Sequence, residues 1–438
     1  MRIKRYQAYK NSEIEGLGSI PEHWELSRIK QKGSVRGRVG WKALKADEYV
    51  DDGYIFLSTP NIKEKYINFE NVNYITYERY IESPEIMLQK GDILLTKDGS
   101  TLGTTNIVSL LPREATVNSS IAVLRFKKEV FNKYLFYQIL SDLIQHKISL
   151  KKSGMGVPHL FQRDINNFFV LLPPLTEQKT IAHYLDTTTA QIERKIDLLT
   201  QKATLYSNLK QSLINETVTR GLDKTVPMKD SGVKWIGEVP EHWKVTAIAN
   251  ITTTVSIKNY PDEELLSVYR DYGVIIKNTR DDNHNKAGQN LDSYKLVEPG
   301  YLVINKMKAW QGSLGVSEFR GIVSPAYITC RTDKRIIERG YLHHLLRCRT
   351  YINEYNRLSY GVRVDQWDMR YDDFKYVPVL LPPLSEQKTI ADYLDTKTAQ
   401  IDQIIQTINT QIEKLKELRK TLINDVVTGK IKVVENEH

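Results

Sequence analysis

The 438-residue sequence has only two cysteines, Cys330 and Cys348, and no long apolar run. Two cysteines cannot build the disulfide framework of a small secreted protein, so a reducing compartment is expected. The longest apolar stretches fall well short of the roughly 20 residues that span a bilayer, and the first residues lack the apolar segment of a signal peptide. The sequence therefore predicts a cytoplasmic protein that does not enter a membrane.

The sequence also lacks the common signatures of catalysis. It contains no G-x-G-x-x-G, no P-loop, no Cys-x-x-Cys pair and no H-E-x-x-H. Asp92 and Lys97 could belong to a nuclease site, but the equivalent residues of the second half are Tyr301 and Lys306. A salt bridge at the end of a strand, or a solvated pair, explains Asp92 and Lys97 better. We therefore expect no catalytic residue and no metal site, and predict that the chain is not an enzyme.

A long internal repeat is the strongest feature that the sequence does have. Leu171–Ile192 recurs as Leu380–Ile401 with three differences, and Ile20–Trp24 has a shorter echo in Val239–Trp243. Between these markers the second half is ten residues shorter, and elsewhere the halves align only weakly. Similar frames with unlike inserts are expected of two sites that do the same job on different targets. The chain is a tandem duplication.

A long helix is predicted to follow each Pro-Pro pair. Thr176 and Ser385 occupy the expected N-cap positions. Apolar residues then recur every seven positions, which indicates a coiled-coil seam. The seam residues are Leu185, Ile192, Ile196, Leu199, Ala203, Tyr206 and Leu213 in the first half, and Leu394, Ile401, Ile405, Ile408, Ile412, Leu415 and Leu422 in the second. The two helices are expected to pair within the chain; the alternative is that each packs on its own domain or on another subunit.

The rest of the chain predicts domains of mixed α and β structure, and its charge predicts a nucleic-acid partner. Tyr, Ile and Val alternate with turn signals, and the stretch 131–147 has helical spacing. The net charge is +9, with 62 Lys and Arg against 53 Asp and Glu. This basic excess suits a polyanionic partner, and nucleic acid is the leading candidate.

The repeated segments resemble a known family. The L-P-P-L-x-E-Q run at Leu172–Ile192 and Leu381–Ile401, together with the P-E-H-W motifs at Pro21–Trp24 and Pro240–Trp243, is similar to type I restriction-modification specificity subunits. The resemblance covers the whole chain and implies an α+β fold: two mixed α/β target recognition domains separated by two long helices, which pair as an antiparallel coiled coil around a pseudo-twofold axis. It places the recognition domains at residues 1–172 and 223–381 and the conserved helical regions at 173–222 and 382–438.

The same resemblance implies a non-catalytic DNA-binding role. Each recognition domain would read one half of a bipartite, asymmetric site in double-stranded DNA, and the helices would set the unread gap. The chain would dock two adenine methyltransferase subunits, which use S-adenosylmethionine, and through them motor-nuclease subunits that need ATP and magnesium; it would hold no cofactor itself. The rival interpretation is an adaptor whose domains bind peptides or RNA, and a self-sufficient nuclease is disfavoured by the missing catalytic residues.

Candidate DNA contacts follow from the chemistry of readout, in which basic and hydroxyl side chains hold phosphates and polar side chains reach base edges. The candidates of the first domain are Lys97, Ser100, Thr101, Lys151, Lys152, Ser153, His159, Gln162 and Arg163. Those of the second are Lys306, Lys308, Trp310, Gln311, Arg363 and Gln366. We expect Lys306 to contact a phosphate and Gln366 to contact a base.

Overall fold

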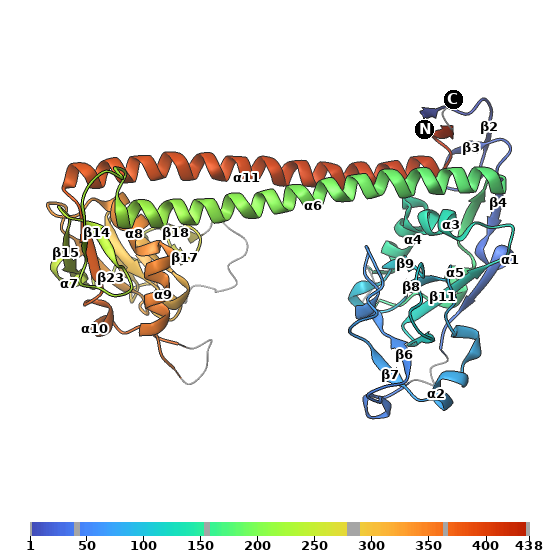
Figure 1. Cartoon of the computed structure of the whole chain (residues 1–438), viewed down its shortest axis with the longest axis horizontal. Helices are drawn as coiled ribbons and strands as arrows, with labels where there is room; N and C mark the ends of the chain where they lie inside the picture. The colour runs from blue at the N-terminus through green and yellow to red at the C-terminus, as the bar shows by residue number, and fades with distance from the viewer. Residues whose placement is uncertain (1, 39–43, 153–157, 278–289, 362–366, 435–438) are drawn as a thin grey trace. The chain divides into compact units, whose positions relative to one another are not determined.

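The computed structural model describes residues 2–38, 44–152, 158–277, 290–361 and 367–434. The chain divides into a first unit, residues 1–198 with 411–438, and a second unit, residues 199–410. Each unit holds one domain of mixed strands and helices and about half of each of two long helices, α6 (Leu175–Arg220) and α11 (Leu384–Val427) (Figure 1). This arrangement confirms the predicted fold class.

An antiparallel four-stranded sheet forms the centre of the first domain. Its strands, in order across the sheet, are β5 (Gly33–Arg36), β11 (Ile121–Phe126), β8 (Ile93–Thr96) and β9 (Thr105–Ile107). All four residues of β8 are buried, as expected for a short apolar run inside a core. A second sheet contains β10 (Ala115–Val117), β6 (Tyr54–Leu57) and β7 (Asn73–Ile75), and β4 (Glu25–Arg28) pairs with β12 (Phe169–Leu172).

Short helices cover these sheets. They are α1 (Ile29–Lys32), α2 (Tyr77–Ile81), α3 (Asn132–Leu140), α4 (Asp142–Lys152) and α5 (Gln162–Asn166). The single helical stretch suggested by residues 131–147 is thus two helices. They break at Ser141, whose backbone is extended and whose buried hydroxyl donates to the carbonyl of Gln138 at 2.6 Å. A serine that bonds its own backbone competes with the helix, which explains the break.

The second domain repeats this plan. Its four-stranded sheet has the order β16 (Thr252–Val255), β23 (Ile328–Thr332), β20 (Tyr301–Ile304) and β21 (Leu314–Val316). The pairs are β15 (Lys244–Ala247) with β24 (Pro378–Leu381), β17 (Leu266–Tyr269) with β18 (Gly273–Ile276), and β19 (Lys295–Val297) with β22 (Gly321–Val323). Its short helices are α7 (Ile248–Ile251), α8 (Arg339–Arg347), α9 (Arg349–Leu358) and α10 (Tyr371–Phe374). The duplication therefore extends to the sheet, where the sequences align only weakly.

In the first unit the two repeated motifs meet each other. Glu177, in the first turn of α6, accepts hydrogen bonds from His23 at 2.8 Å, from the indole of Trp24 at 3.4 Å and from the hydroxyl of Tyr6 at 2.6 Å. Burial and the bond to Glu177 raise the pKa of Tyr6 well above its usual range. The P-E-H-W motif therefore fastens the start of the domain to the long helix.

The second unit repeats this junction with its own copies of the motifs. Glu386 accepts from His242 at 2.8 Å and from the indole of Trp243 at 3.1 Å. The next residue of the repeat, Gln387, donates to the carbonyl of Pro382 at 2.9 Å and accepts from the backbone of Glu338 at 2.8 Å. The near-identity of the repeated segments therefore has a structural cause, because both copies make the same joint between domain and helix.

The starts of the long helices correct the predicted caps. The backbone N–H of Gln178 donates to the carbonyl of Pro174 at 3.0 Å, and α6 begins at Leu175. Thr176 therefore lies inside the first turn, as does Ser385 in α11, which begins at Leu384. Proline at the residues before the first turn fits this start because proline has no N–H to satisfy there.

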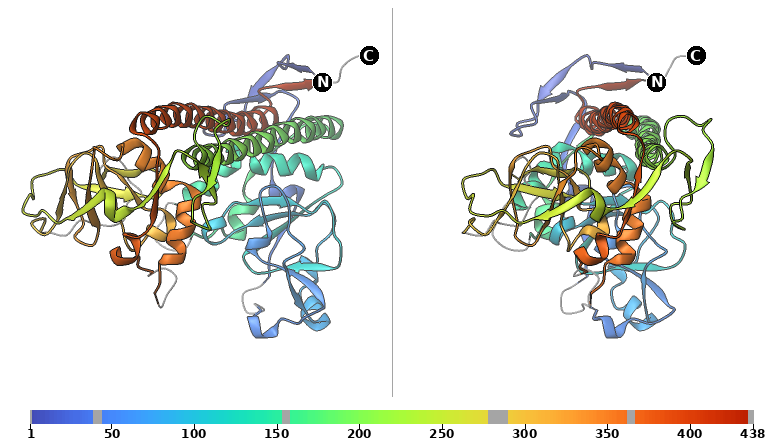
Figure 2. Two further views of the ribbon diagram at one scale, coloured as in Figure 1. Left: turned by 60° about the vertical axis from the view of Figure 1, so that its left-hand side comes forward. Right: turned by 90° about the vertical axis from the view of Figure 1, so that its left-hand side faces the viewer.

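The long helices pair antiparallel in each unit (Figures 1 and 2). Arg419 forms an ion pair with Glu193 in the first unit, and Lys210 forms one with Asp402 at 2.6 Å in the second. The two ion pairs fit one antiparallel register, because Glu193 and Lys210 are 17 residues apart in α6, and Asp402 and Arg419 are 17 residues apart in α11. The views agree with the predicted intramolecular pair.

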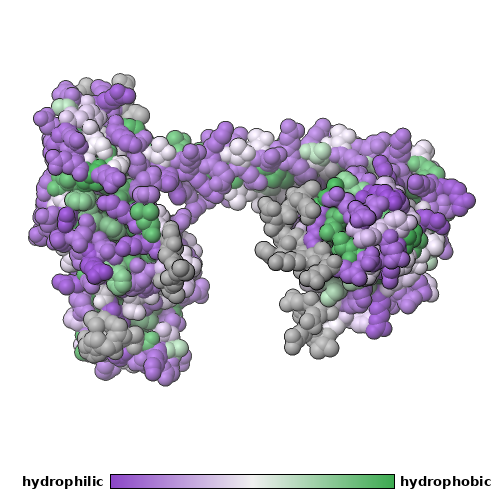
Figure 3. All heavy atoms as spheres, turned by 180° about the vertical axis from the view of Figure 1, so that it is seen from behind, coloured by the Kyte–Doolittle hydropathy of each residue, from purple (hydrophilic) through white to green (hydrophobic). Residues whose placement is uncertain are grey.

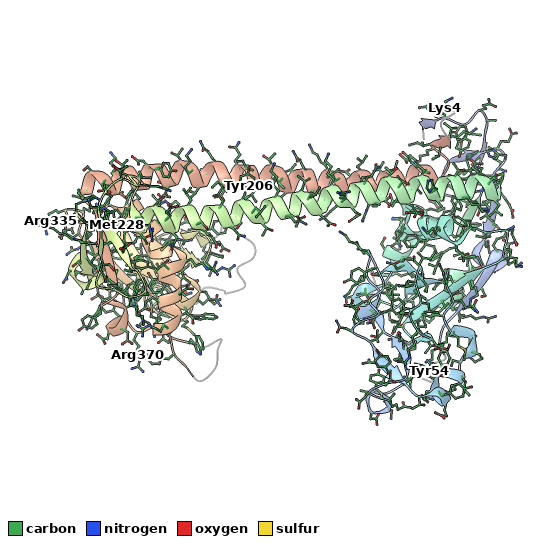
Figure 4. The ribbon with its side chains drawn as sticks, viewed as in Figure 1. Lys4, Tyr54, Tyr206, Met228, Arg335 and Arg370 are labelled. Atoms are coloured by element: carbon green, nitrogen blue, oxygen red, sulfur yellow. The ribbon has the colours of Figure 1, made fainter. Side chains whose placement is uncertain are left out.

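Burial separates the seam from the other faces of these helices. Every predicted seam residue is buried or half-buried, including Tyr206, labelled in Figure 4. Leu198, Leu205 and Leu209, which the heptad pattern leaves out, are 57%, 67% and 54% exposed. The face seen in Figure 3 is mostly hydrophilic along the helices. At their ends the helices also pack on the domains, where Leu185 joins the core of the first domain.

The two ends of the chain pair with each other in the first unit. Strand β1 (Arg2–Lys4) runs antiparallel to β25 (Lys432–Val434). Just before β25, Gly429 has a φ of +78° and lies against Trp24. Gly221, with a φ of +76°, lies against Trp243 in the same way in the second unit, where the chain continues without a break. In the first unit a hairpin of β2 (Tyr9–Asn11) and β3 (Ser19–Pro21) comes after β1. In the second unit the equivalent hairpin of β13 (Met228–Asp230) and β14 (Glu238–Pro240) comes after Gly221.

Candidate nucleic-acid interface

The turn after β8 holds three of the predicted contacts of the first domain. The strand ends at Thr96, and its buried hydroxyl bonds the carbonyl of Thr101 across the turn. A 3-10 turn covers Gly99–Thr101. Ser100 is exposed, while Lys97 and Thr101 are half-buried. A short tight turn that projects from a buried strand holds these side chains on a rigid base.

A second segment lies beside this turn; it contains His159, which is 61 residues after Asp98 in the sequence. The backbone of Leu160 donates to the carbonyl of Lys97 at 2.8 Å, and Gly99 donates to the carbonyl of Pro158 at 3.2 Å. The imidazole of His159 bonds Asp98. Leu160 is fully buried and anchors the segment. The structure thus brings together Lys97, Ser100, Thr101 and His159, which the sequence predicted from two separate stretches.

The second domain forms the same junction. The backbone of Met369 donates to the carbonyl of Lys306 at 3.0 Å, and Met369 is fully buried. The ammonium of Lys306 lies 3.0 Å from a carboxylate oxygen of Asp368. The rings of Trp310 and Trp367, one from each segment, have centroids 5.6 Å apart. Arg370, labelled in Figure 4, continues this segment toward α10.

Lysines gather around Lys306. Burial, with Lys258 and Lys306 as neighbouring cations, lowers the pKa of Lys295, which donates to the carbonyl of Tyr327 at 2.6 Å. Lys308 is exposed on the turn that follows. Several cations at one end of a domain suit the phosphates of a nucleic acid.

The remaining candidates are placed less favourably or are not described. Gln162 is exposed, but its amide donates to the backbone carbonyl of Val35. Arg163 lies over the ring of Phe161 at 5.1 Å. Lys151 lies 3.8 Å from Asp164.

Other predicted contacts add little or stay untested. Gln311 is half-buried at the end of the 3-10 turn Ala309–Gln311. Lys152 is the last residue of α4, and its side chain is outside the description. Ser153, Arg363 and Gln366 lie outside the described residues, so their roles stay predictions.

Sequence reasoning missed four residues of this junction. Asp98, Asp368 and Trp367 contact predicted residues directly, and Phe161, 50% exposed, packs its ring against that of His159 at 4.4 Å. A sequence signal for Asp368 did exist. Lys97 and Lys306 are equivalent residues, and the offset between them also aligns His159 with Asp368. Asp92, by contrast, forms a salt bridge with Arg125 at 2.7 Å and not the suggested pair with Lys97.

Within the described residues, no group of three or more His, Cys, Asp or Glu side chains is placed to hold a metal ion. No described helix has the length and apolar character needed to cross a membrane.

Lys306→Ala should weaken binding to all DNA sequences and lower the slope of log affinity against log salt by about 0.9, the value for one lost phosphate contact. Lys334→Ala, which removes an exposed lysine of the same domain, is the matched control and should leave the slope unchanged. Binding of the chain with its partner subunits, measured at several salt concentrations, provides the test. Equal slopes for Lys306→Ala and the unsubstituted chain would show that Lys306 contacts no phosphate.

Comparison with known proteins gives a consistent result. The family model described as "Type I restriction modification DNA specificity domain" matches twice, at residues 21–201 and 240–414. The MjaVIII type I restriction enzyme specificity subunit of Methanocaldococcus jannaschii is 26% identical over 452 residues, covering 98% of this chain and 97% of that protein. The EcoKI specificity subunit of Escherichia coli is 21% identical, covering 94% of this chain and 90% of that protein.

Solved structures show the same fold. A chain from a study of the assembly and conformational transition of a type I restriction-modification system superposes with a TM-score of 0.68 at 17% identity, covering 93% of this chain and 98% of its own length. The HsdS subunit of Thermoanaerobacter tengcongensis gives a TM-score of 0.50 at 16% identity, covering 96% of this chain and 99% of that one.

Proposed function

Because the chain belongs to the family of type I restriction-modification DNA specificity domains, we propose that it is the subunit that selects the DNA sequence for such a complex. Each domain reads one half of a bipartite, asymmetric site in double-stranded DNA. The paired helices α6 and α11 hold the unread gap. The chain has no catalytic role of its own.

One observation carries this proposal. The same two-segment junction occurs once in each domain, after equivalent strands, and its side chains differ between the copies: Lys97 with Asp98 and His159 in the first, Lys306 with Asp368 in the second. Equal scaffolds that present unlike side chains are what two different half-sites require, because bases are discriminated by the donors and acceptors that reach their edges. An adaptor for one repeated ligand would need no such difference.

The partners in the proposal are two adenine methyltransferase subunits and motor-nuclease subunits. The long helices are continuous and mostly hydrophilic on the face seen in Figure 3, and the joints at Glu177 and Glu386 have the same contacts. Two equivalent docking surfaces support two copies of one partner. S-adenosylmethionine, ATP and magnesium would be used by those partners.

A map of methylated adenines tests the proposal. The chain and the methyltransferase encoded beside it are expressed in a host without adenine methylation, and the genome is sequenced by a method that detects N6-methyladenine. We expect a new motif of two unlike parts separated by a fixed unread gap. If the complex forms and no motif appears, the DNA-specificity proposal fails and the adaptor interpretation replaces it.

A further inference from the structure

Among the described residues of the junction in the second domain, Asp368 supplies a carboxylate. The backbone of Asp368 donates to the carbonyl of Tyr360 at 3.0 Å and accepts from the backbone of Tyr360 at 3.3 Å. The next residue, Met369, is buried and bonded to Lys306. Backbone hydrogen bonds on both sides therefore fix the position from which the Asp368 side chain projects, as a residue that reads a base requires.

The carboxylate of Asp368 has acceptor capacity to spare. Lys306 bonds one oxygen. The other has no hydrogen-bond partner among the described residues but is enclosed, so a base would meet the oxygen that Lys306 bonds. The side chain as a whole is 37% exposed. A carboxylate offers about four lone-pair sites, so one ammonium leaves most of them unused. If the Lys306 ammonium turns to a phosphate when DNA binds, the Asp368 oxygen that it bonds becomes free to accept another hydrogen bond.

A negative charge at this place needs an explanation, because the phosphates of DNA repel it. In the first domain the same register position holds His159, which is bonded to Asp98 of the turn. The polarity is thus reversed between the copies: the first has its acid on the turn, and the second has its acid, Asp368, on the later segment. A group that donates to the carboxylate would offset the repulsion.

We propose that Asp368 determines specificity in the second domain by accepting a hydrogen bond from the N4 amine of a cytosine in the major groove. This inference rests on the proposed function. Cytosine is the base whose polar group in the major groove is a donor alone. Adenine places the N7 acceptor beside its amine, and guanine and thymine present acceptors there, which a carboxylate repels.

The substitution Asp368→Asn tests the inference in the complex with the methyltransferase. Asparagine keeps the shape but adds a donor, and it pairs with adenine. The methylated motif should change at one base of its second half, where the preference for cytosine should fall about 10- to 100-fold. The first half of the motif should stay the same. Asp372→Asn is the matched control, since Asp372 is an exposed carboxylate of the same segment paired with Lys375 at 2.7 Å, and it should leave the motif unchanged.

The outcomes separate this inference from the proposed function. If the unsubstituted chain gives no bipartite motif, the proposed function fails. If it gives one, but Asp368→Asn leaves the motif unchanged or the second half contains no cytosine on either strand, the inference is overturned and the function stands. If Asp368→Asn methylates nothing, binding to duplexes with each base at each second-half position decides: an equal loss for all bases overturns the inference, and a changed order of preference supports it.

Discussion

Trp24→Ala and Trp243→Ala should each lower the free energy of unfolding of one unit by about 3–5 kcal/mol, the cost typical of truncating a large buried aromatic side chain. Both indoles are fully buried. Trp24 packs edge-on against the ring of Tyr134, with centroids 6.5 Å apart. Each truncation also removes an indole donor from Glu177 or Glu386, so it leaves a cavity and weakens the joint with the long helix.

Hydrogen exchange followed by mass spectrometry reports the two units separately. Trp24→Ala should raise exchange in the first unit and leave the second unchanged, and Trp243→Ala should do the reverse. Tyr66→Ala removes a side chain that is 56% exposed and should change neither. Loss of protection throughout the chain from either tryptophan variant would show that the units do not unfold independently, against the prediction.

Inserting seven residues into both long helices should lengthen the unread gap by about three base pairs. One heptad adds about 10 Å of helix, close to three base-pair steps of DNA, and returns the seam residues to the same face. The insertions are placed after Gln201 in α6 and after Thr410 in α11, points that lie midway between the ion pairs Glu193–Arg419 and Lys210–Asp402. Methylation should move to sites with the longer gap, and the bases of both half-sites should stay the same.

An insertion into α6 alone is the control for this experiment. It shifts one helix against the other by a heptad, so the two ion pairs can no longer keep one register, and methylation should fall at every gap length. A double insertion that changed the bases of a half-site, or left the gap as it was, would contradict the spacer role. The adenine map that tests the proposed function also provides this measurement.

The long helices could be predicted well because their signal is local. The seven-residue repeat predicted that Leu199 and Leu213 lie in the seam, and both are half-buried. It left out Leu198, Leu205 and Leu209, and all three are exposed. The helix starts were missed by two residues because Thr176 looks like a cap in sequence, whereas the fold uses the carbonyl of Pro174. Capping patterns are less specific than a heptad repeated along a whole helix.

The candidate interface could be predicted only in part because it joins distant segments. The equivalence of Lys97 with Lys306 located the turn in both domains. The partners Asp98 and Asp368 were missed because the backbone bonds that align the two segments depend on the sheet, which no local pattern specifies. The repeated P-E-H-W and E-Q motifs identified the family, but the contacts of Glu177 show that they join a domain to its helix.

Because β1 pairs with β25, the order of strands and helices along the chain is circular and is interrupted between these two strands. In the second unit the covalent chain passes from Gly221 to the hairpin at Met228–Asp230; in the first, the same passage is made by two strands from opposite ends of the polypeptide. Which unit is encoded first is then only a matter of where this circular order is interrupted. A polypeptide that began between Gly221 and Met228, with β25 joined to β1 by a short linker, would keep the same strands and helices in each unit and would keep both recognition domains.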